Sequence, residues 1–283
     1  MADSEAMRAY DLHTHSVHSD GTTTPEEIAR EAAALGLAGF ALTDHDTISG
    51  WSEAREAAAA HGIEFLPGME LTTQHAGYSR HLLGYGMDPA AAELFAALDH
   101  VRTARIERAR EMVRRVSRDY AIRWEDVVGD GDARTVGRPH VADALVAGGY
   151  FPDRSTAFEV ALHPGSPYYL GTYALDTSDT IRMVRRAGGR AVLAHPAAMR
   201  QRSAATPKDI AELAVAGLWG VELNHPENRE DWLPPLVAAV AELGLETTGA
   251  SDYHGAGKTN RLGERTTPGD VVDRLRADLA VSR

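Results

Sequence analysis

Short apolar segments alternate with amphipathic, helix-like segments along most of this chain. Apolar residues that recur every three or four positions indicate helices, and short apolar runs bounded by polar residues indicate buried strands. In the N-terminal part the predicted strands cover residues 11–15, 39–42, 64–69 and 81–85. In the C-terminal part they cover residues 190–194, 220–225 and 247–254. The helices predicted between them, at 25–35, 49–62, 209–215 and 236–243, imply parallel strands joined by helical crossovers.

The first predicted helix carries signals for both of its ends. Thr24 is a favourable N-cap residue, Pro25 suits the first helical position, and Glu27 completes a capping box. Gly36 follows the last apolar position and suits a C-terminal cap. We therefore expect this helix to begin at Pro25 and to end just before Gly36.

The alternation of strands and helices stops between residues 87 and 171. Helices are predicted there at residues 90–120, 140–148 and 153–162, and no strand pattern separates them. We therefore expect an inserted helical cap domain, residues 87–171, over the mouth of a barrel formed by residues 8–86 and 172–283.

Polar side chains gather where the predicted strands end. His13 and His15 lie two positions apart on one strand, so their side chains project to the same face and could grip one metal ion. An exposed polar edge strand is the alternative for this pair taken alone. Other strands end in the same way, at His45, Glu70, His195 and His254. In a parallel barrel these ends share the face that carries the site, which favours a metal centre.

Composition narrows the chemistry. The 283 residues include no cysteine, so any metal must be held by His, Asp and Glu, which suits Mn, Zn or Fe. The net charge of −12 argues against binding to long duplex nucleic acid but permits a small anionic substrate. Seven arginines lie between residues 101 and 118, and the favoured interpretation is a solvated helix face with Glu107 and Glu111 as partners. No signal peptide and no apolar run of membrane-spanning length is present, so we expect a cytoplasmic protein without membrane contact.

An ordered set of motifs resembles the polymerase and histidinol phosphatase (PHP) family. The motifs are Asp11-Leu12-His13-Thr14-His15, Thr43-Asp44-His45, Gly68-Met69-Glu70, His81, Ala194-His195-Pro196 and Ser251-Asp252-Tyr253-His254. The resemblance implies an α/β fold, a distorted (β/α)7 TIM-like barrel, with two or three divalent metal ions. It also implies three ligand groups: His13, His15, Glu70 and Asp252; Glu70, His81 and His195; and Asp20, His45 and His254. Glu70 would bridge the first two.

The sequence around Asp20 resembles the family branch that contains nucleotide phosphatases and short-RNA exonucleases. The segment from Gly137 to His140 resembles the cap of the 3′,5′-nucleotide phosphatase subgroup, which implies that Arg138 and His140 contact the substrate phosphate. A structural helix cap with Arg138 on the surface is the alternative. Arginine suits phosphate because its planar fork matches two phosphate oxygens.

The expected function is hydrolysis of a phosphate ester on a small nucleotide-like substrate, by in-line attack of a metal-bound hydroxide. A nucleoside 3′,5′-bisphosphate or a nucleoside monophosphate is the leading substrate. A phosphodiesterase is the alternative, either a 5′–3′ exonuclease on short RNA or a hydrolase of a cyclic phosphate. A non-catalytic PHP module is a third hypothesis.

Four more polar residues enter the prediction with weaker roles. His225 ends a strand on the same face, where it could touch the substrate or protonate the leaving group. Lys258 follows the last ligand and could contact phosphate or remain in solvent. Asp44 and Asp46 flank His45 and are expected to orient imidazoles rather than to act in catalysis. The sequence makes no prediction of oligomeric state.

Overall fold

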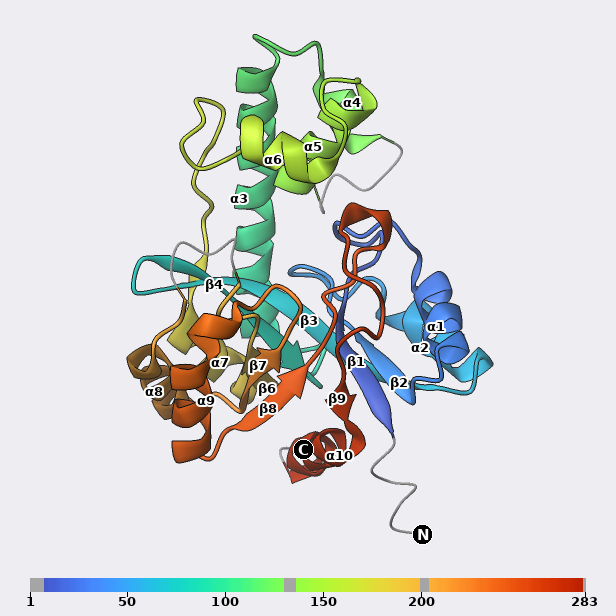
Figure 1. The fold of residues 1–283 in the computed structure, drawn as a ribbon, viewed down its shortest axis with the longest axis vertical. Helices are drawn as coiled ribbons and strands as arrows, with labels where there is room; N and C mark the ends of the chain where they lie inside the picture. Colours follow the sequence, from blue (N-terminus) through green and yellow to red (C-terminus); the bar gives the residue numbers. More distant parts are fainter. Residues whose placement is uncertain (1–7, 130–135, 199–203, 282–283) are drawn as a thin grey trace.

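A curled β-sheet with helices around it forms the body of the molecule (Figure 1). The computed structural model describes residues 8–129, 136–198 and 204–281. Eight strands follow one another in the order β8-β7-β6-β4-β3-β2-β1-β9, and β5 pairs with β3 outside this path. The strands are β1 Ala9–Thr14, β2 Gly39–Leu42, β3 Glu64–His75, β4 Tyr78–Tyr85, β5 Leu175–Asp176, β6 Arg190–Leu193, β7 Gly220–Asn224, β8 Glu246–Gly249 and β9 Thr267–Pro268.

The sheet closes almost completely into a barrel at β9. This strand pairs with β1, and the hydroxyl group of Thr267 bridges to the backbone N–H and C=O of Gly249 on β8 at 2.9 and 2.7 Å. The predicted TIM-like α/β barrel is therefore confirmed, with eight strands in a nearly closed ring.

The described helices are α1 Pro25–Ala34, α2 Trp51–Ala60, α3 Ala92–Val116, α4 Trp124–Val128, α5 Arg138–Ala147, α6 Arg154–Val160, α7 Thr177–Arg186, α8 Pro207–Ala216, α9 Leu233–Glu242 and α10 Gly269–Val281. Seven of these ten helices overlap the predicted ones, and no specific prediction covered α4, α7 and α10. The capping box of α1 is present: the Thr24 hydroxyl accepts from the backbone of Glu27, and Glu27 accepts from the backbone of Thr24 at 2.8 Å. Gly36 follows with φ +73°, as a C-terminal cap requires.

The expectation of an all-parallel sheet is wrong for two strands. β9 runs antiparallel to β1, and β4 is the second. β4 runs antiparallel to both β3 and β6, whereas β1-β2-β3 and β6-β7-β8 are parallel. The reason is the two-residue turn of Ala76 and Gly77, which has φ of +49° and +81° and can join only antiparallel neighbours. β3 also continues to His75, so Glu70 lies inside this strand and not at its end.

The segment between β4 and β5 contains helices α3 to α6 (Figure 1). The first turns of α3 pack into the apolar cluster of the barrel through Leu94 and Leu98, whereas α4, α5 and α6 stand apart from the barrel. The long helix α3 rises from the barrel, and α4, α5 and α6 gather against its far part. They enclose an apolar cluster of their own, which includes Met112, Val116, Val141 and Leu145. This arrangement supports our proposal that residues 87–171 form a cap domain.

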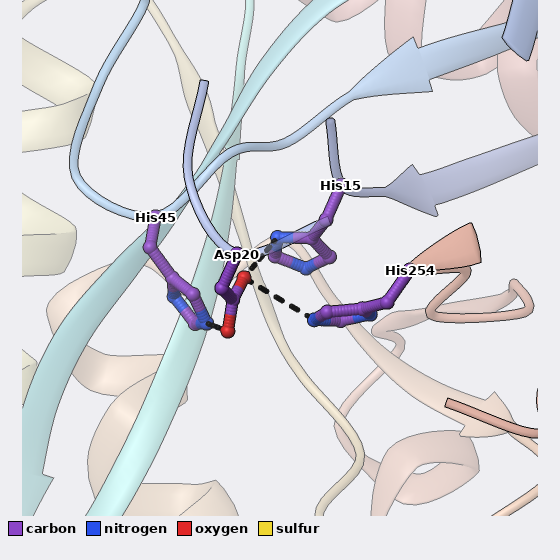
Figure 2. Close-up of side chains that lie close together, drawn as sticks. All are labelled: His15, Asp20, His45 and His254. Atoms are coloured by element: carbon purple, nitrogen blue, oxygen red, sulfur yellow. Dashed lines mark ion pairs between the residues drawn. The ribbon is translucent and has the colours of Figure 1, made fainter. Parts of the chain in front are cut away.

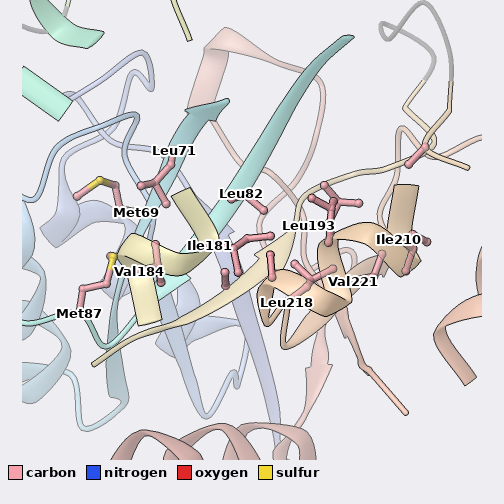
Figure 3. Close-up of a cluster of buried hydrophobic side chains, with 14 of the residues drawn as sticks. Met69, Leu71, Leu82, Met87, Ile181, Val184, Leu193, Ile210, Leu218 and Val221 are labelled. Atoms are coloured by element: carbon pink, nitrogen blue, oxygen red, sulfur yellow. The ribbon is translucent and has the colours of Figure 1, made fainter. Parts of the chain in front are cut away.

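A larger apolar cluster holds the sheet against its outer helices (Figure 3). Side chains of β3 and β4, such as Leu71 and Leu82, meet Ile181 and Val184 of α7, and all four are fully buried. Burial of this kind contributes about 1.5–3 kcal/mol for each large apolar side chain. Among the described residues no helix is both long and apolar enough to cross a membrane.

Candidate metal centre

The barrel brings all nine predicted ligand residues to one end of the sheet. β1 and the loop after it supply His13, His15 and Asp20, and the loop after β2 supplies His45. Glu70 and His81 come from neighbouring positions of β3 and β4, because Glu70 pairs with Leu83 and Thr72 pairs with His81. The remaining three residues follow β6 and β8: His195, Asp252 and His254.

Glu70 lies at the centre of the cluster and is 1% exposed. Its Oε1 atom lies 2.6 Å from Nδ1 of His81 and 3.0 Å from Nε2 of His195. Its Oε2 atom lies within 3.3 Å of one ring nitrogen of each of His13, His15 and His45. The two oxygens of one carboxylate thus face two different sets of imidazoles, as a bridging ligand requires.

Asp20 gathers a second group of ring nitrogens (Figure 2). Its Oδ1 atom lies 3.4 Å from Nε2 of His254 and 3.6 Å from Nδ1 of His15, and its Oδ2 atom lies 3.8 Å from Nε2 of His45. The four side chains form one group whose donor atoms all lie within 4.8 Å of one another. This group contains the predicted third set together with His15.

Asp252 completes the group that contains His13 and His15. Its Oδ1 atom lies 3.4 Å from Nε2 of each of these rings, while its Oδ2 atom faces Nζ of Lys258 at 2.6 Å. His13, His15, Glu70 and Asp252 form a buried group of possible ligand atoms within 4.8 Å. Lys258 is therefore held against a predicted ligand and does not line the cavity described below.

The donor set fits a divalent cation. Nε2 of His13 and Nε2 of His15 face each other at 3.1 Å. A neutral imidazole has one N–H group and one nitrogen lone pair, so each ring can direct only one of them at this point. Nδ1 of His45 is buried and lies 3.3 Å from Oε2 of Glu70, yet it makes no hydrogen bond to any described residue. A cation between such atoms would satisfy all of them, and nitrogen and oxygen donors without sulfur suit Mn, Zn or Fe.

The pKa shifts divide the cluster: carboxylates favour positive charge on His13 and His15, whereas burial lowers the pKa of His45 and, together with Lys258, lowers that of His254 to about 4. Burial opposes charge on His15, but Asp252 and Glu70 outweigh it and raise the pKa of His15 to about 9. Burial likewise opposes charge on His13, and Glu222, Glu70 and Asp252 raise its pKa well above the usual value. The carboxylate of Glu70, despite its burial, keeps a pKa well below the usual range because imidazoles surround it. In the metal-free protein, protons on the His13 and His15 rings supply the positive charge that a metal ion would otherwise supply.

Backbone strain is concentrated in the same region. Asp46, His195 and Asp252 have φ of +53°, +29° and +55°, three of the four non-glycine residues with positive φ in the described part of the chain. Such conformations cost about 1–3 kcal/mol each and persist where the surroundings hold them in place. Tertiary contacts therefore set the orientation of these loops.

A cavity of about 340 Å³ opens beside the ligands and extends under the cap. Its barrel side includes Asp20, His45 and His81. Its cap side includes Arg105, Arg108, Arg138, His140 and Tyr169. The two predicted substrate contacts of the cap, Arg138 and His140, thus lie in the same cavity as three predicted ligands.

Two of these arginines were not expected at the site. The prediction of a solvated helix face holds for Arg114 and Arg115, which pair with Glu111, but it is wrong for Arg105 and Arg108, which line the cavity. Residues three apart share one side of a helix, and that spacing is the signal that could have separated the two groups.

Arg108 is held on both sides within the cavity wall. Its Nε donates to the backbone C=O of Leu170 at 2.8 Å, and its guanidinium lies 5.5 Å from the ring centre of Tyr169. Burial, together with nearby Arg138, lowers the pKa of Arg108 to about 10. Within the described residues no carboxylate forms an ion pair with Arg108, so an anion would improve its electrostatic surroundings.

Arg105 ties the cap to the loop after β2. Asp46, which is fully buried, accepts from the backbone and hydroxyl of Thr72 at 2.8 and 2.7 Å and from the Arg105 guanidinium. Asp44 accepts from Ser16 and Ser19. Both aspartates therefore hold loops, and Asp44 also reaches an imidazole indirectly, because the Ser19 hydroxyl that it accepts from lies 3.4 Å from Nδ1 of His15.

His225 lies behind the ligands. Its side chain is 0% exposed, is not part of the cavity wall, and places Nε2 3.4 Å from Oδ2 of Asp252. This position favours support of Asp252 over direct contact with a substrate. Glu222, which the sequence analysis missed, is fully buried and lies 3.0 Å from Nδ1 of His13. A charged residue inside an apolar strand was the available signal.

Comparisons with known sequences agree with the motifs. A family model described as the PHP domain matches residues 11–128. A 3′,5′-nucleoside bisphosphate phosphatase from Chromobacterium violaceum is 35% identical over 262 residues, which cover 90% of each chain. A 5′-3′ exoribonuclease from Haemophilus influenzae is 31% identical over 87% of this chain and 90% of its own. A phosphoribosyl 1,2-cyclic phosphate 1,2-diphosphodiesterase from Eggerthella lenta is 30% identical over 90% of this chain and 98% of its own.

Solved structures share the complete fold. A protein from Bifidobacterium adolescentis, described as a metal-dependent phosphoesterase, superimposes with a TM-score of 0.93 at 39% identity and covers 96% of both chains. A protein from Chromobacterium violaceum, described as an amidohydrolase with bound sulfate, superimposes with a TM-score of 0.85 at 32% identity. The latter alignment covers 95% of this chain and 96% of the other.

Proposed function

This chain belongs to the PHP family of metal-dependent phosphoesterases, and from this premise we propose that it removes a phosphate group from a nucleoside 3′,5′-bisphosphate or a nucleoside monophosphate. The observation that carries the proposal is one cavity lined both by predicted metal ligands and by three arginines. Its volume of about 340 Å³ lies in the range typical of small-ligand sites.

We propose that the nine predicted ligands hold two or three divalent ions of Mn, Zn or Fe. Ions held there would supply positive charge against the phosphoryl oxygens and lower the pKa of a water molecule for attack. Glu70 places one carboxylate oxygen towards His13 and His15 and the other towards His81 and His195, which fixes the spacing of the first two ligand groups.

His140 is a candidate donor to the substrate phosphate. Its Nδ1 accepts a hydrogen bond from the backbone N–H of Gly137 at 3.1 Å, so the neutral ring carries its proton on Nε2. Burial lowers the pKa of His140, which keeps the ring neutral near pH 7. This Nε2–H group contacts the backbone of Ser19, in the loop that carries Asp20, and we propose that it binds the reacting phosphate when a substrate is present.

Arg108 and Arg138 form the second anion site of the proposal. Both guanidinium groups lie near the ring of Tyr169, at 5.5 and 5.7 Å from its centre. The positive charge of Arg138 contributes to the lowered pKa of Arg108, and an anion beside Arg108 would favour its charged form. A substrate with two phosphates would place one at the metal ligands and one here, which favours a bisphosphate.

A phosphodiesterase is the second candidate. The arginine pair would also receive the terminal 5′-phosphate of a short RNA, and relatives of this chain include a 5′-3′ exoribonuclease and a cyclic phosphate diesterase. The two candidates share the metal centre and differ in which ester bond is broken.

Phosphate release from a substrate panel tests the proposal. The chelated protein, supplied with Mn²⁺, is incubated with adenosine 3′,5′-bisphosphate, AMP, a 2′,3′-cyclic nucleotide and a short 5′-phosphorylated RNA, and the nucleotide products are identified. Metal-dependent phosphate release that is fastest from the bisphosphate or AMP is the expected result. Faster cleavage of the cyclic nucleotide or RNA would transfer the function to the second candidate, and the absence of any metal-dependent turnover would contradict both.

A further inference from the structure

Glu222 is a buried carboxylate that lies behind the predicted metal ligands and is not itself one of them. It lies on β7 and is 0% exposed. Its Oε1 atom lies 3.0 Å from Nδ1 of His13, and its Oε2 atom accepts from the backbone N–H of His195 at 2.9 Å. One side chain therefore contacts two predicted ligands that come from β1 and from the loop after β6.

The contact with His13 determines which ring nitrogen can bind a metal. Nδ1 faces Glu222, whereas Nε2 faces Glu70 at 3.2 Å and Asp252 at 3.4 Å. A carboxylate accepts but cannot donate, so Nδ1 must carry the proton of the neutral ring. Nε2 is then left with its lone pair directed at the centre of the cluster.

The contact with His195 holds a strained backbone. His195 has φ +29°, in the left-handed region that non-glycine residues rarely adopt. The same residue must direct Nε2 towards Oε1 of Glu70, which lies 3.0 Å away. A carboxylate bond to its N–H offsets part of the strain and fixes the direction from which the ring extends.

We propose that Glu222 is a positioning residue of the metal centre: it imposes coordination through Nε2 on His13 and holds the His195 backbone in its strained conformation. Carboxylates that accept from the second nitrogen of a ligating histidine have this effect in metal sites generally. The inference rests on the metal centre of the proposed function but is independent of which ester is cleaved.

A competing arrangement uses the same atoms. The donor atoms of His13, Glu222 and His225 lie within 4.8 Å of one another, as a further ion site would require. However, Nδ1 of His225 accepts from the backbone N–H of Glu227 at 3.1 Å, so the neutral ring carries its proton on Nε2. That nitrogen cannot bind a metal in this state, which favours the positioning role.

The Glu222→Gln substitution tests the carboxylate without changing the size of the side chain, because an amide cannot accept a hydrogen bond from both His13 and His195. An amide has one acceptor and one donor group, whereas both partners of Glu222 present N–H groups. The backbone N–H of His195 cannot become an acceptor, so the amide either directs NH₂ at His13 and forces its proton onto Nε2, or directs NH₂ at His195. Either orientation disturbs a predicted ligand.

Zn²⁺ binding to the chelated full-length protein, followed by isothermal titration calorimetry, is the experiment. Glu222→Gln is expected to weaken binding by about 10- to 100-fold, as supporting carboxylates do. Glu246→Gln is the matched control, because Glu246 begins the neighbouring strand and pairs with Arg274; it should bind Zn²⁺ within about twofold of wild type. In a His13→Ala background, Glu222→Gln should cause a much smaller further loss.

NMR of histidine-¹⁵N-labelled, Zn²⁺-loaded protein reads the tautomer directly. His13 should be bound through Nε2 with a proton on Nδ1. Metal bound to Nδ1 of His13 would overturn the inference in favour of a further ion site, and equal Zn²⁺ affinity in wild type and Glu222→Gln would overturn it without affecting the proposed function. A wild-type protein that binds no divalent ion would overturn the proposed function and this inference together.

Discussion

Arg108 and Arg114 lie on the same helix, yet their surroundings differ. Arg114 is 60% exposed at its side chain and pairs with Glu111. Arg108 is half-buried in the cavity wall beside Tyr169. The difference matters because an arginine in a water-poor wall binds an anion more tightly than one in bulk solvent.

Arg108→Ala is expected to raise KM for a nucleoside 3′,5′-bisphosphate by about 10- to 100-fold, because a charge-assisted hydrogen bond contributes about 1.5–3 kcal/mol. The effect on kcat should be smaller, since the guanidinium binds the phosphate that does not react. Steady-state kinetics of phosphate release measures both constants. Arg114→Ala is the control and should leave them unchanged, and equal effects of the two substitutions would contradict the second anion site.

Glu70→Gln is expected to reduce both metal content and activity by more than about 100-fold. This loss is larger than the loss of about 10- to 100-fold that is typical of residues that only support a metal ligand. The amide lacks the charge and the second acceptor oxygen that face the five imidazoles. Elemental analysis of the purified protein and a phosphate-release assay measure the two losses. Glu64→Gln, at the start of the same strand and away from the cluster, is the control. Full activity in Glu70→Gln would rule out the bridging role.

At the scale of elements, the β3–β4 hairpin decides the geometry of Glu70 and His81. Pairing of Thr72 with His81 and of Glu70 with Leu83 places the two ligands on one face of the sheet, two residue pairs apart. The hairpin depends on a turn with two residues of positive φ, and only the second of them is glycine. Ala76 therefore carries strain in a turn that orients two predicted ligands.

Ala76→Gly is expected to stabilise the protein by about 0.5–1 kcal/mol, because glycine removes the left-handed penalty but adds entropy to the unfolded chain. Gly77→Ala should instead destabilise the protein by about 1–2 kcal/mol, because φ there is +81°. No described atom lies within 4 Å of the added methyl group, so the cost comes from the backbone conformation and not from a steric clash. Urea denaturation of each variant measures these changes. Destabilisation by Ala76→Gly would contradict this account of the turn.

Arginines of the cap also reach the loops that carry predicted ligands. Arg154 of α6 binds Asp143 of α5 through two hydrogen bonds of 2.7 and 2.6 Å and donates to the backbone C=O of Asp20 at 3.1 Å. Arg105 of α3 binds Asp46 on the other side of the cavity. Arg154 and Arg105 therefore connect the cap to the two loops that carry Asp20 and His45.

At the scale of the whole molecule, metal and protons compete for the same cluster. The pKa of His15 is raised to about 9, and that of His13 is also raised, so the metal-free protein holds protons there at neutral pH. A raised histidine pKa stabilises the folded state below the unfolded value near 6.5, and this contribution is lost as pH rises through about 9. A bound divalent ion reverses the sign, because its affinity increases as the protons leave.

We expect the difference in Tm between metal-loaded and chelated protein to widen as pH rises from about 6 to about 9. The chelated protein should lose stability over this range while Mn²⁺ binding becomes tighter. Thermal denaturation with Mn²⁺ or with chelator, at several pH values, measures the difference. A constant or shrinking difference over this range would contradict competition between protons and metal.

The sequence by itself determined the barrel, the limits of α1 and the nine residues that meet at one end of the sheet. Periodicity and capping residues predict the strands, the helices and the limits of α1. The rule that parallel strand ends share a face indicates His15, His45, His195 and His254. Asp20, His81 and Asp252 follow only from the resemblance of the motifs to the PHP family, and His81 in fact lies on an antiparallel strand. The antiparallel direction of β4 follows from the local turn at Ala76 and Gly77, which the sequence analysis missed. Tertiary structure decided the inward orientation of Arg105 and Arg108 and the place of Glu222. Glu222 and His13 are 209 positions apart, and such a contact is set by the packing of the closed sheet rather than by any local pattern.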